Sequence, residues 1–369
     1  MIKYSIINCL LCFLLFGCIT EYHATGLNEI ENILVVEGII TDDETTITLS
    51  RSVNLTDNAA GSNYVNHAKV SIECSDGSQV QAEPTVSNGR YLLKTGTLDL
   101  EQKYRLKIQI DEFEYESKDY LKPNITPEID SIFWTKKDRG QPVMIYIATH
   151  SPDNHNDLFY RWAFKEDWEI HSDLFLDKYP FYCWSMANNR DLLTGSSVRT
   201  VFGRISDNLI NLSPSDRRLS VLYRINVKQN AISKNAFDYF ENIKKNAQQT
   251  GSIFAPTPSE LRGNIVCITD PGIPVIGYVD VSTTTQKHRF ISRRDNVYEA
   301  PPWACEEVPQ DSLLKWYGLI PPSYVLFHEA EESEDPEEPP EITTYVPLRC
   351  VNCTLFGTEQ KPEDWPDTY

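Results

Sequence analysis

The chain contains 369 residues, of which 41% are hydrophobic, and its formal net charge is −19. The hydrophobic content supports cores of ordinary size, which excludes a disordered chain, and the length suggests two domains. The acidic balance argues against nucleic acid as a partner, because phosphate contacts require clusters of lysine and arginine, and against electrostatic adhesion to anionic lipid.

The first eighteen residues have the features of a bacterial lipoprotein signal. A charged start precedes an apolar run at residues 6–16. This run is about half the ~20 residues that a membrane-spanning helix needs, so it indicates a signal peptide. The sequence Leu-Phe-Gly-Cys at 15–18 resembles a lipobox, which is cleaved before an acylated cysteine. We therefore predict a signal peptide at 1–17, lipid attachment at Cys18 and a tether at 18–31.

Residues 32–122 are predicted to form an immunoglobulin-like β-sandwich. About seven short segments in this region have strand character, and turn residues separate them at regular spacing. Apolar and polar side chains alternate clearly at residues 70–74 and 104–110, which is typical of half-buried strands. A module of this kind serves more often as a spacer or docking surface than as a catalytic domain.

Pro123 and Pro127 mark a boundary, and residues 128–369 are predicted to form a larger β-rich domain with one amphipathic helix. Ser233 is a suitable N-cap for this helix and Gly251 a suitable stop. The apolar positions at helical spacing are Ala236, Phe237, Phe240, Ile243 and Ala247. The fold class is therefore mainly β.

Residues 329–341 contain eight acidic side chains and four residues of proline or serine, and they are predicted to be a solvated acidic, proline-rich loop. The alternative is that this loop binds a basic partner surface or divalent cations. A second polar run, at 153–157, has oxygen donors suited to Ca²⁺. It lacks the glycine and the distal glutamate of an EF-hand loop, so it is interpreted as a hairpin turn.

Ten aromatic residues lie between positions 159 and 184. Such a concentration can form a platform for a sugar or a peptide, or it can form a core between two sheets. Tyr160, Trp162 and Phe164 share one face of a predicted strand, which favours the core. Trp168 and Tyr179 lie beside charged residues and remain candidates for ligand binding at the surface.

Six of the nine cysteines remain after Cys9, Cys12 and Cys18 are assigned to the signal and the lipid. Export to an oxidising compartment predicts disulfides, and six cysteines allow fifteen full pairings. A redox role for Cys350 and Cys353 needs a strand-to-helix context, and a zinc site needs further ligands at fixed spacing. We favour a structural disulfide that involves Cys305. The disulfide candidates are Cys183, Cys267, Cys305, Cys350 and Cys353.

Several segments, in their order and spacing, resemble domain-of-unknown-function family 4249. They include Leu34-Val35-Val36-Glu37-Gly38, Tyr160-Arg161-Trp162, Cys183-Trp184, Val275-Ile276-Gly277-Tyr278 and Cys350-Val351-Asn352-Cys353-Thr354. The resemblance implies a lipoprotein of Gram-negative bacteria, commonly encoded beside an outer-membrane TonB-dependent transporter. It implies no catalytic residues, because the family has no assigned activity.

No sequence motif of an enzyme or a cofactor site is found. The chain has no Gly-x-Ser-x-Gly, no His-Glu-x-x-His and no phosphate-binding glycine loop, although a carboxylate-based hydrolase would leave no local signature. We expect no enzymatic activity, no cofactor, no metal and no nucleic-acid partner.

The resemblance and the lipobox together predict the role and the location. We expect an outer-membrane, lipid-anchored protein on the cell surface that acts as a binding or accessory subunit of a TonB-dependent transporter, by nutrient capture or as a lid on the barrel. The alternative is a structural subunit of an outer-membrane protein assembly or secretion complex.

Overall fold

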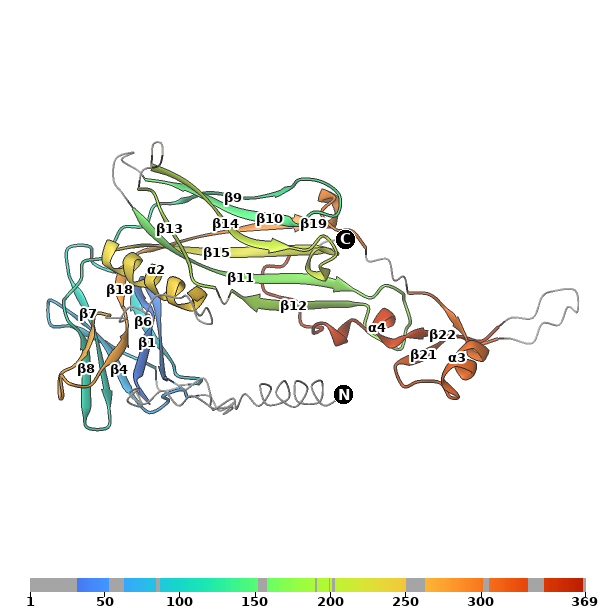
Figure 1. The fold of residues 1–369 in the computed structure, drawn as a ribbon, viewed down its shortest axis with the longest axis horizontal. Coiled ribbons are helices and arrows are strands. Elements are labelled where there is room, and N and C mark those ends of the chain that lie inside the picture. The colour runs from blue at the N-terminus through green and yellow to red at the C-terminus, as the bar shows by residue number, and fades with distance from the viewer. Residues whose placement is uncertain are drawn as a thin grey trace, which may run out of the picture.

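The computed structural model describes residues 32–52, 63–83, 87–151, 158–189, 191–198, 200, 203–249, 263–300, 305–330 and 342–367. This part of the chain is mainly β, as predicted (Figure 1). The predicted signal peptide, the tether with Cys18, the polar run at 153–157, Gly251 and most of the acidic loop lie outside the described residues. None of the described helices combines the length and the apolar character that crossing a bilayer requires.

Two sheets packed face to face form the first sandwich. One has the order β17-β1-β3-β6 and the other the order β16-β8-β7-β4-β5, and their buried side chains make one continuous core. The predicted alternation holds in β7, where Tyr104, Leu106, Ile108 and Ile110 are buried. The strands from the first part of the chain are β1 (Leu34–Glu37), β2 (Ile39–Thr41), β3 (Asp43–Arg51), β4 (Lys69–Cys74), β5 (Gln79–Gln81), β6 (Arg90–Gly96), β7 (Tyr104–Ile110) and β8 (Phe113–Ser117).

Three short strands from much later in the chain complete this sandwich, and here the structure differs from the predicted domain boundaries. β16 (Ile265–Cys267) pairs with β8, β17 (Val275–Gly277) pairs in parallel with β1, and β18 (Asp280–Ser282) pairs in parallel with β2. They cover strand edges that residues 32–122 alone would leave open. A Cβ at Gly277 would lie 2.4 Å from the carbonyl oxygen of Val36, so this close pairing requires glycine.

The second sandwich packs the sheet β14-β10-β9 against the sheet β12-β11-β15-β19, with β13 added beside β11. Tyr160, Trp162 and Phe164 point into its core, which confirms the core interpretation of these three aromatics. Its strands are β9 (Ile129–Lys136), β10 (Val143–His150), β11 (Phe159–His171), β12 (Tyr182–Asn188), β13 (Leu193–Ser196), β14 (Arg204–Leu212), β15 (Leu222–Ile232) and β19 (Thr284–Ser292). The short helix η2 (Arg217–Leu219) precedes β15.

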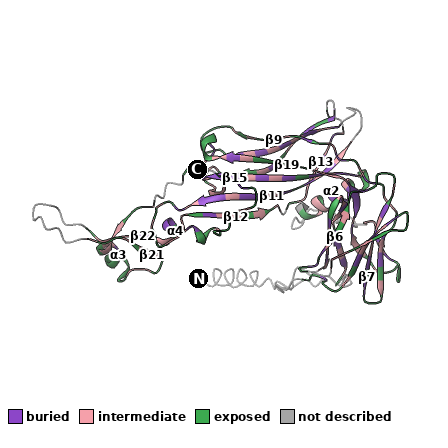
Figure 2. Ribbon diagram, turned by 180° about the vertical axis from the view of Figure 1, so that it is seen from behind, coloured by how far each residue is buried: buried purple, intermediate pink, exposed green. Residues whose placement is uncertain are grey.

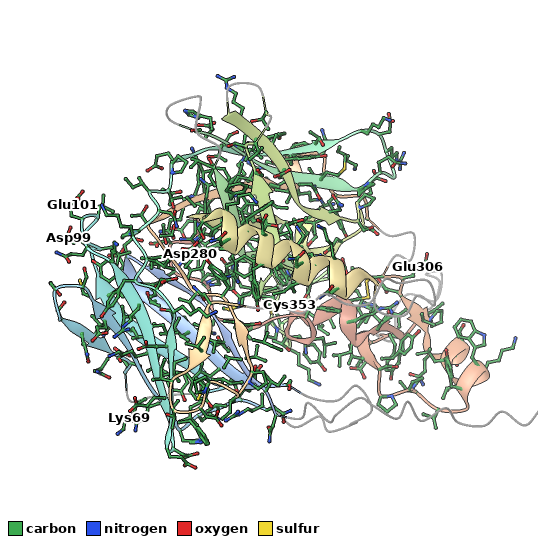
Figure 3. All side chains as sticks on the ribbon, turned by 60° about the vertical axis from the view of Figure 1, so that its left-hand side comes forward. Lys69, Asp99, Glu101, Asp280, Glu306 and Cys353 are labelled. Atoms are coloured by element: carbon green, nitrogen blue, oxygen red, sulfur yellow. A yellow bond between two sulfur atoms is a disulfide. The ribbon has the colours of Figure 1, made fainter. Side chains whose placement is uncertain are left out.

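The predicted helix is α2 (Lys234–Gln249), and it lies between the two sandwiches (Figure 1). The Oγ of Ser233 accepts a hydrogen bond from the backbone N–H of Ala236 (3.2 Å), as expected of an N-cap. Beside the start of α2, the buried carboxylate of Asp280 accepts a hydrogen bond from the N–H of Ser233 at 2.6 Å (Figure 3). Burial raises the pKa of Asp280. The helix α2, the strand β18 and both sandwiches therefore meet at Asp280.

A small third sheet with the order β20-β22-β21 extends from the second sandwich (Figure 1). Its elements are β20 (Val308–Pro309), α3 (Gln310–Tyr317), β21 (Tyr324–His328) and β22 (Thr344–Pro347), followed by α4 (Leu348–Val351) and η4 (Cys353–Leu355). The sequence patterns did not predict α3. Its end could have been recognised at Gly318, which has a φ of 73° and donates its N–H to the carbonyl of Leu314.

A charged cluster on the outer face of the first sandwich yields a test of pH dependence. The carboxylate of Glu73 accepts hydrogen bonds from Tyr120 Oη (2.7 Å), Arg105 Nε (2.6 Å) and Lys107 Nζ (3.1 Å). The Tyr120 hydrogen bond, with help from Arg105 and Lys107, lowers the pKa of Glu73 from 4.5 to about 2. The ionised form therefore stabilises the fold above pH 4.5, and this contribution is lost as the pH falls towards 2.

We expect Glu73→Gln to lower the free energy of unfolding by about 1–2 kcal/mol at pH 7, a value reduced for solvent screening near the surface. Urea denaturation at several pH values measures the difference from wild type, which should shrink below pH 4.5 and vanish near pH 2. Glu114→Gln is the matched control, because Glu114 is exposed on β8 of the same sheet. A difference that stays constant over this pH range would contradict the assigned pKa.

Candidate docking arm

The third sheet and its helices form a narrow projection, which we call the arm and define as residues 305–330 and 342–351. Figure 1 shows it extending away from both sandwiches, with α3 beyond the end of the sheet. β22 is the central strand and pairs with both β20 and β21. Of the residues of α3, Leu313 alone is buried. The arm therefore has little core of its own and needs other connections to hold its position.

Two disulfides fasten the base of the arm, and they confirm four of the five candidate cysteines. Cys305 is bonded to Cys350 and Cys183 to Cys353, with Cα–Cα distances of 5.8 and 5.7 Å that are normal for disulfides. Cys353 lies at the foot of the arm in Figure 3. The sequence favoured a disulfide between Cys305 and either Cys350 or Cys353, and the structure shows that Cys350 is the partner.

The remaining interpretations of the Cys350-x-x-Cys353 pair are wrong, since each cysteine is bonded to a different partner. They do not form a redox pair with each other. The Sγ atoms of Cys305 and Cys350 lie within 4.8 Å of a carboxylate oxygen of Asp173, but both sulfurs are used in the disulfide and are not thiolate ligands.

Cys267 was also a disulfide candidate, and the structure corrects this: Cys267 and Cys74 are buried free thiols. Both belong to the first sandwich, whereas the four bonded cysteines lie on β12 of the second sandwich, in the arm and in η4, which directly follows the arm. Within the sheet, β16 and β4 are separated by β8 and β7. Three strand spacings amount to about 14 Å, which is too far for a disulfide between Cys267 and Cys74.

The arm carries an unusual concentration of exposed apolar side chains. Trp316 is 63% exposed, and Tyr317, Leu319 and Ile342 are exposed to a similar degree. The arm is largely green and pink in Figure 2, in contrast to the purple interiors of the sandwiches. Large exposed aromatic residues of this kind are typical of surfaces that bind another protein.

The same region is strongly acidic. Between positions 305 and 351 the sequence contains eleven aspartate and glutamate residues against Lys315 and Arg349, and seven of the eleven belong to residues 331–341, which join the two parts of the arm in the sequence. The arm and this connecting sequence therefore combine apolar anchors with a net negative charge. A partner surface that fits it must offer an apolar groove with basic residues around it.

Trp168 and Tyr179, the two ligand-binding candidates, do not meet in one site. Trp168 is half-buried and, with Ile170, Arg218 and Phe356, lines an open pocket of about 380 Å³. The guanidinium of Arg218 lies 6.0 Å from its ring centre. Tyr179 is half-buried in the turn before β12 and does not line this pocket, and the ammonium of Lys178 lies 5.4 Å from its ring.

Three buried carboxylates on β11 pair with side chains of η2, β15, β11 itself and the C-terminal segment. Glu169 accepts hydrogen bonds from the indole Nε1 of Trp365 (3.0 Å), and it pairs with His171 (2.7 Å). Asp167 accepts from Arg224 Nη2 (2.8 Å). Glu166 accepts from Arg218 Nη1 (2.8 Å) and Tyr223 Oη (2.8 Å). Since all three are paired, they are structural anchors for this end of the second sandwich.

The C-terminal segment returns from the arm to the second sandwich. Trp184 on β12 and Thr358 exchange two backbone hydrogen bonds, each of 2.8 Å. The guanidinium of Arg217 lies 4.1 Å from the ring centre of Phe356. Together with the Cys183–Cys353 disulfide, these contacts fix where the arm leaves the body of the protein.

A comparison with models of protein families gives a match. The model of a family described as "Domain of unknown function (DUF4249)" matches residues 19–288. This range contains both sandwiches except for the last residues of β19, and it ends before the arm. No curated protein matches the chain.

Proposed function

Because this chain belongs to the DUF4249 family, we propose that it is a lipid-anchored accessory subunit of an outer-membrane TonB-dependent transporter. Lipid on Cys18 would hold it at the outer membrane, facing the cell surface. Two acyl chains or more bind a bilayer stably, at roughly 0.8 kcal/mol per buried CH₂. The family description assigns no activity, so the proposal rests on the lipobox, the family resemblance and the shape and chemistry of the arm.

The observation that carries the proposal is the exposed aromatic surface on the arm. Trp316 and Tyr317 are the residue types that contribute most to protein interfaces when they enter a pocket of the partner. The arm projects from the body, so it can enter a concave surface that neither sandwich could reach (Figure 1). Two disulfides hold it in place before binding, which lowers the entropy lost on docking.

A binding role agrees better with the buried charges than an enzymatic role does. A general acid or base must be free to exchange a proton with the substrate. The described carboxylates that are most buried on β11 are Glu166, Asp167 and Glu169, and all of them are committed to neighbouring side chains. The proposal therefore includes no catalytic step and no cofactor.

The test is co-purification of the full protein from membranes of its native host in mild detergent. We expect a transporter barrel to co-purify with the wild type. Trp316→Asp should reduce the recovered barrel by about tenfold or more, because it places a charge on the main anchor of the interface. Ile125→Asp is the matched control: Ile125 is 64% exposed but lies in the linker between the sandwiches, and it should leave recovery unchanged.

A barrel that co-purifies equally with the Trp316 variant would contradict docking through the arm, and recovery of a strictly monomeric protein would contradict the proposal as a whole. Depletion of the protein distinguishes a role in transport from a role in outer-membrane assembly or secretion. A growth defect on one nutrient supports transport. General loss of outer-membrane proteins supports the alternative, a structural subunit of an assembly or secretion complex.

A further inference from the structure

A pocket of about 520 Å³ lies where the first sandwich meets β11 and α2. This volume lies in the range typical of sites for small molecules. β1 and β17 form one wall, and Tyr239 and Phe240 of α2 form another. The pocket exists because the late strand β17 returns to pair with β1, so both sandwiches and the helix contribute to it.

Three of the segments that carry the family resemblance meet at this pocket. They are residues 35–38 of β1 and its end, residues 161–162 of β11, and residues 276–278 at the end of β17. More than a hundred positions separate each of them from the next along the chain, and no interaction in the docking arm involves them. The pocket therefore accounts for sequence features that the arm does not use.

Arg161 supplies the positive charge of the pocket. It lies on the face of β11 opposite to the buried Tyr160 and Trp162, and its guanidinium lies 4.9 Å from the ring centre of Phe240. Within the described part of the chain, no acceptor forms a hydrogen bond or an ion pair with this guanidinium. Burial lowers the pKa of Arg161, and the negative charge of Glu37 acts in the opposite direction.

A half-buried arginine with its five donors unused costs folding free energy, because the charge has lost water without gaining an acceptor. The other cations of the second sandwich avoid this cost. Arg218 and Arg224, for example, each form hydrogen bonds to a buried carboxylate. An acceptor brought by a ligand would complete the environment of Arg161, and a carboxylate matches the guanidinium in shape and charge.

The rest of the lining restricts the ligand further. Arg161 is the only cation among the lining residues, and Glu37 and Asp191 are exposed carboxylates at the rim. One positive charge beside two negative charges favours a ligand with a single carboxylate over one with a phosphate dianion. The two carboxylates at the rim favour a ligand that also carries an ammonium group. Burial, with the charge of Glu37, raises the pKa of Tyr239 to about 12, so its phenol stays neutral and can donate a hydrogen bond.

We propose that this pocket binds a short peptide with a free C-terminal carboxylate and an apolar or aromatic side chain. The carboxylate pairs with Arg161, the side chain packs against Phe240 and Tyr278, and the peptide ammonium lies towards Glu37 and Asp191. This deepens the proposed function by naming a cargo class, but it uses different residues from the docking arm, so the two proposals can fail separately.

The test is isothermal titration calorimetry on the full mature chain in detergent with the dipeptides Leu-Phe and Val-Tyr as probes. Each is compared with its C-terminal amide and its N-acetyl form. We expect the free acids to bind, and the amide to weaken binding by about tenfold to a hundredfold because it removes the charge that pairs with Arg161. N-acetylation should weaken binding by a smaller factor, since the rim carboxylates are exposed.

Arg161→Gln should weaken binding of the free acid by the same factor that separates acid from amide in the wild type. The variant should bind the acid and the amide with equal affinity. Arg161→Lys should restore part of the affinity. Arg204→Gln, at an exposed arginine on β14, is the matched control and should leave affinity unchanged. In the described part of the chain the guanidinium of Arg161 forms no hydrogen bond or ion pair, so Arg161→Gln loses only the contact with the ring of Phe240 and should change the melting temperature little. A melting curve therefore distinguishes lost binding from lost folding.

Three results would overturn this proposal: no binding of either free acid up to millimolar concentration, equal affinity for acid and amide, or full affinity in Arg161→Gln. None of them bears on the arm. Co-purification of the barrel with Arg161→Gln, together with lost peptide binding, would separate the pocket from the docking surface.

Discussion

Replacing both Cys183 and Cys353 with alanine is expected to lower the free energy of unfolding by about 4–5 kcal/mol, the largest single effect that the structure predicts. The disulfide joins positions 170 residues apart, and a crosslink over so long a loop removes much of the entropy of the unfolded chain. Both cysteines are fully buried, so the variant also loses packing between β12 and η4.

Chemical denaturation monitored by tryptophan fluorescence measures this loss. The control is Cys305→Ala with Cys350→Ala, which removes the disulfide within the arm, over a loop of 45 residues, and should mainly loosen the arm. Thiol titration of denatured chains that lack residues 1–18 checks the pairing, and wild type should give two thiols, from Cys74 and Cys267. Six thiols in the wild type, or an unchanged midpoint in the Cys183 and Cys353 variant, would contradict the assignment.

Arg218→Met is expected to lower the free energy of unfolding by about 3–5 kcal/mol. Glu166 is only 3% exposed, and Arg218 is its one cationic partner in the described part of the chain. Without the guanidinium the carboxylate keeps a single hydrogen bond, from Tyr223. Burial and the charge of Glu166 raise the pKa of Tyr223 well above its ordinary value, so this phenol remains a donor but cannot neutralise the charge.

The neighbouring Arg217 provides the control. Its ion pair with Asp173 and its contact with the ring of Phe356 both lie at partly exposed positions, so Arg217→Met should cost about 1 kcal/mol, measured by urea denaturation. The double variant Arg218→Met with Glu166→Gln should recover much of the loss, because no charge is then left buried without a partner. If the double variant is as unstable as Arg218→Met alone, the cost lies in packing around Trp168 and the buried ion pair is not its cause.

Local patterns correctly predicted the elements whose stability depends on neighbours in sequence. Helix α2 has its apolar positions at helical spacing and a capping serine at position 233, and both features act within a few residues. The alternation in β7 and the shared face of Tyr160, Trp162 and Phe164 likewise follow from the two-residue repeat of a strand. These patterns were enough to identify a mainly β protein with cores between sheets.

The same patterns could not show which strands meet. β16, β17 and β18 are three residues long, and what holds them is the open edges of β8, β1 and β2, far away in the sequence. α3 was missed for a different reason: it has only eight residues, and its apolar positions, Leu313, Leu314, Trp316 and Tyr317, span little more than one turn, which is too short for periodicity to distinguish a helix. Trp316 and Tyr317 could be recognised as a candidate interface only from the structure, which shows that both side chains are exposed.

The sequence by itself determined the fold class, the main helix, the aromatic core of β11, the family resemblance and a set of candidate cysteines. The tertiary structure alone decided the disulfide partners, the free state of Cys267 and the pocket around Arg161. The physical reason is the range of the interactions. Repeats and caps act over a few residues, whereas a disulfide partner, an open strand edge or an unpaired charge depends on segments far apart in the sequence, such as cysteines separated by 45 and 170 positions.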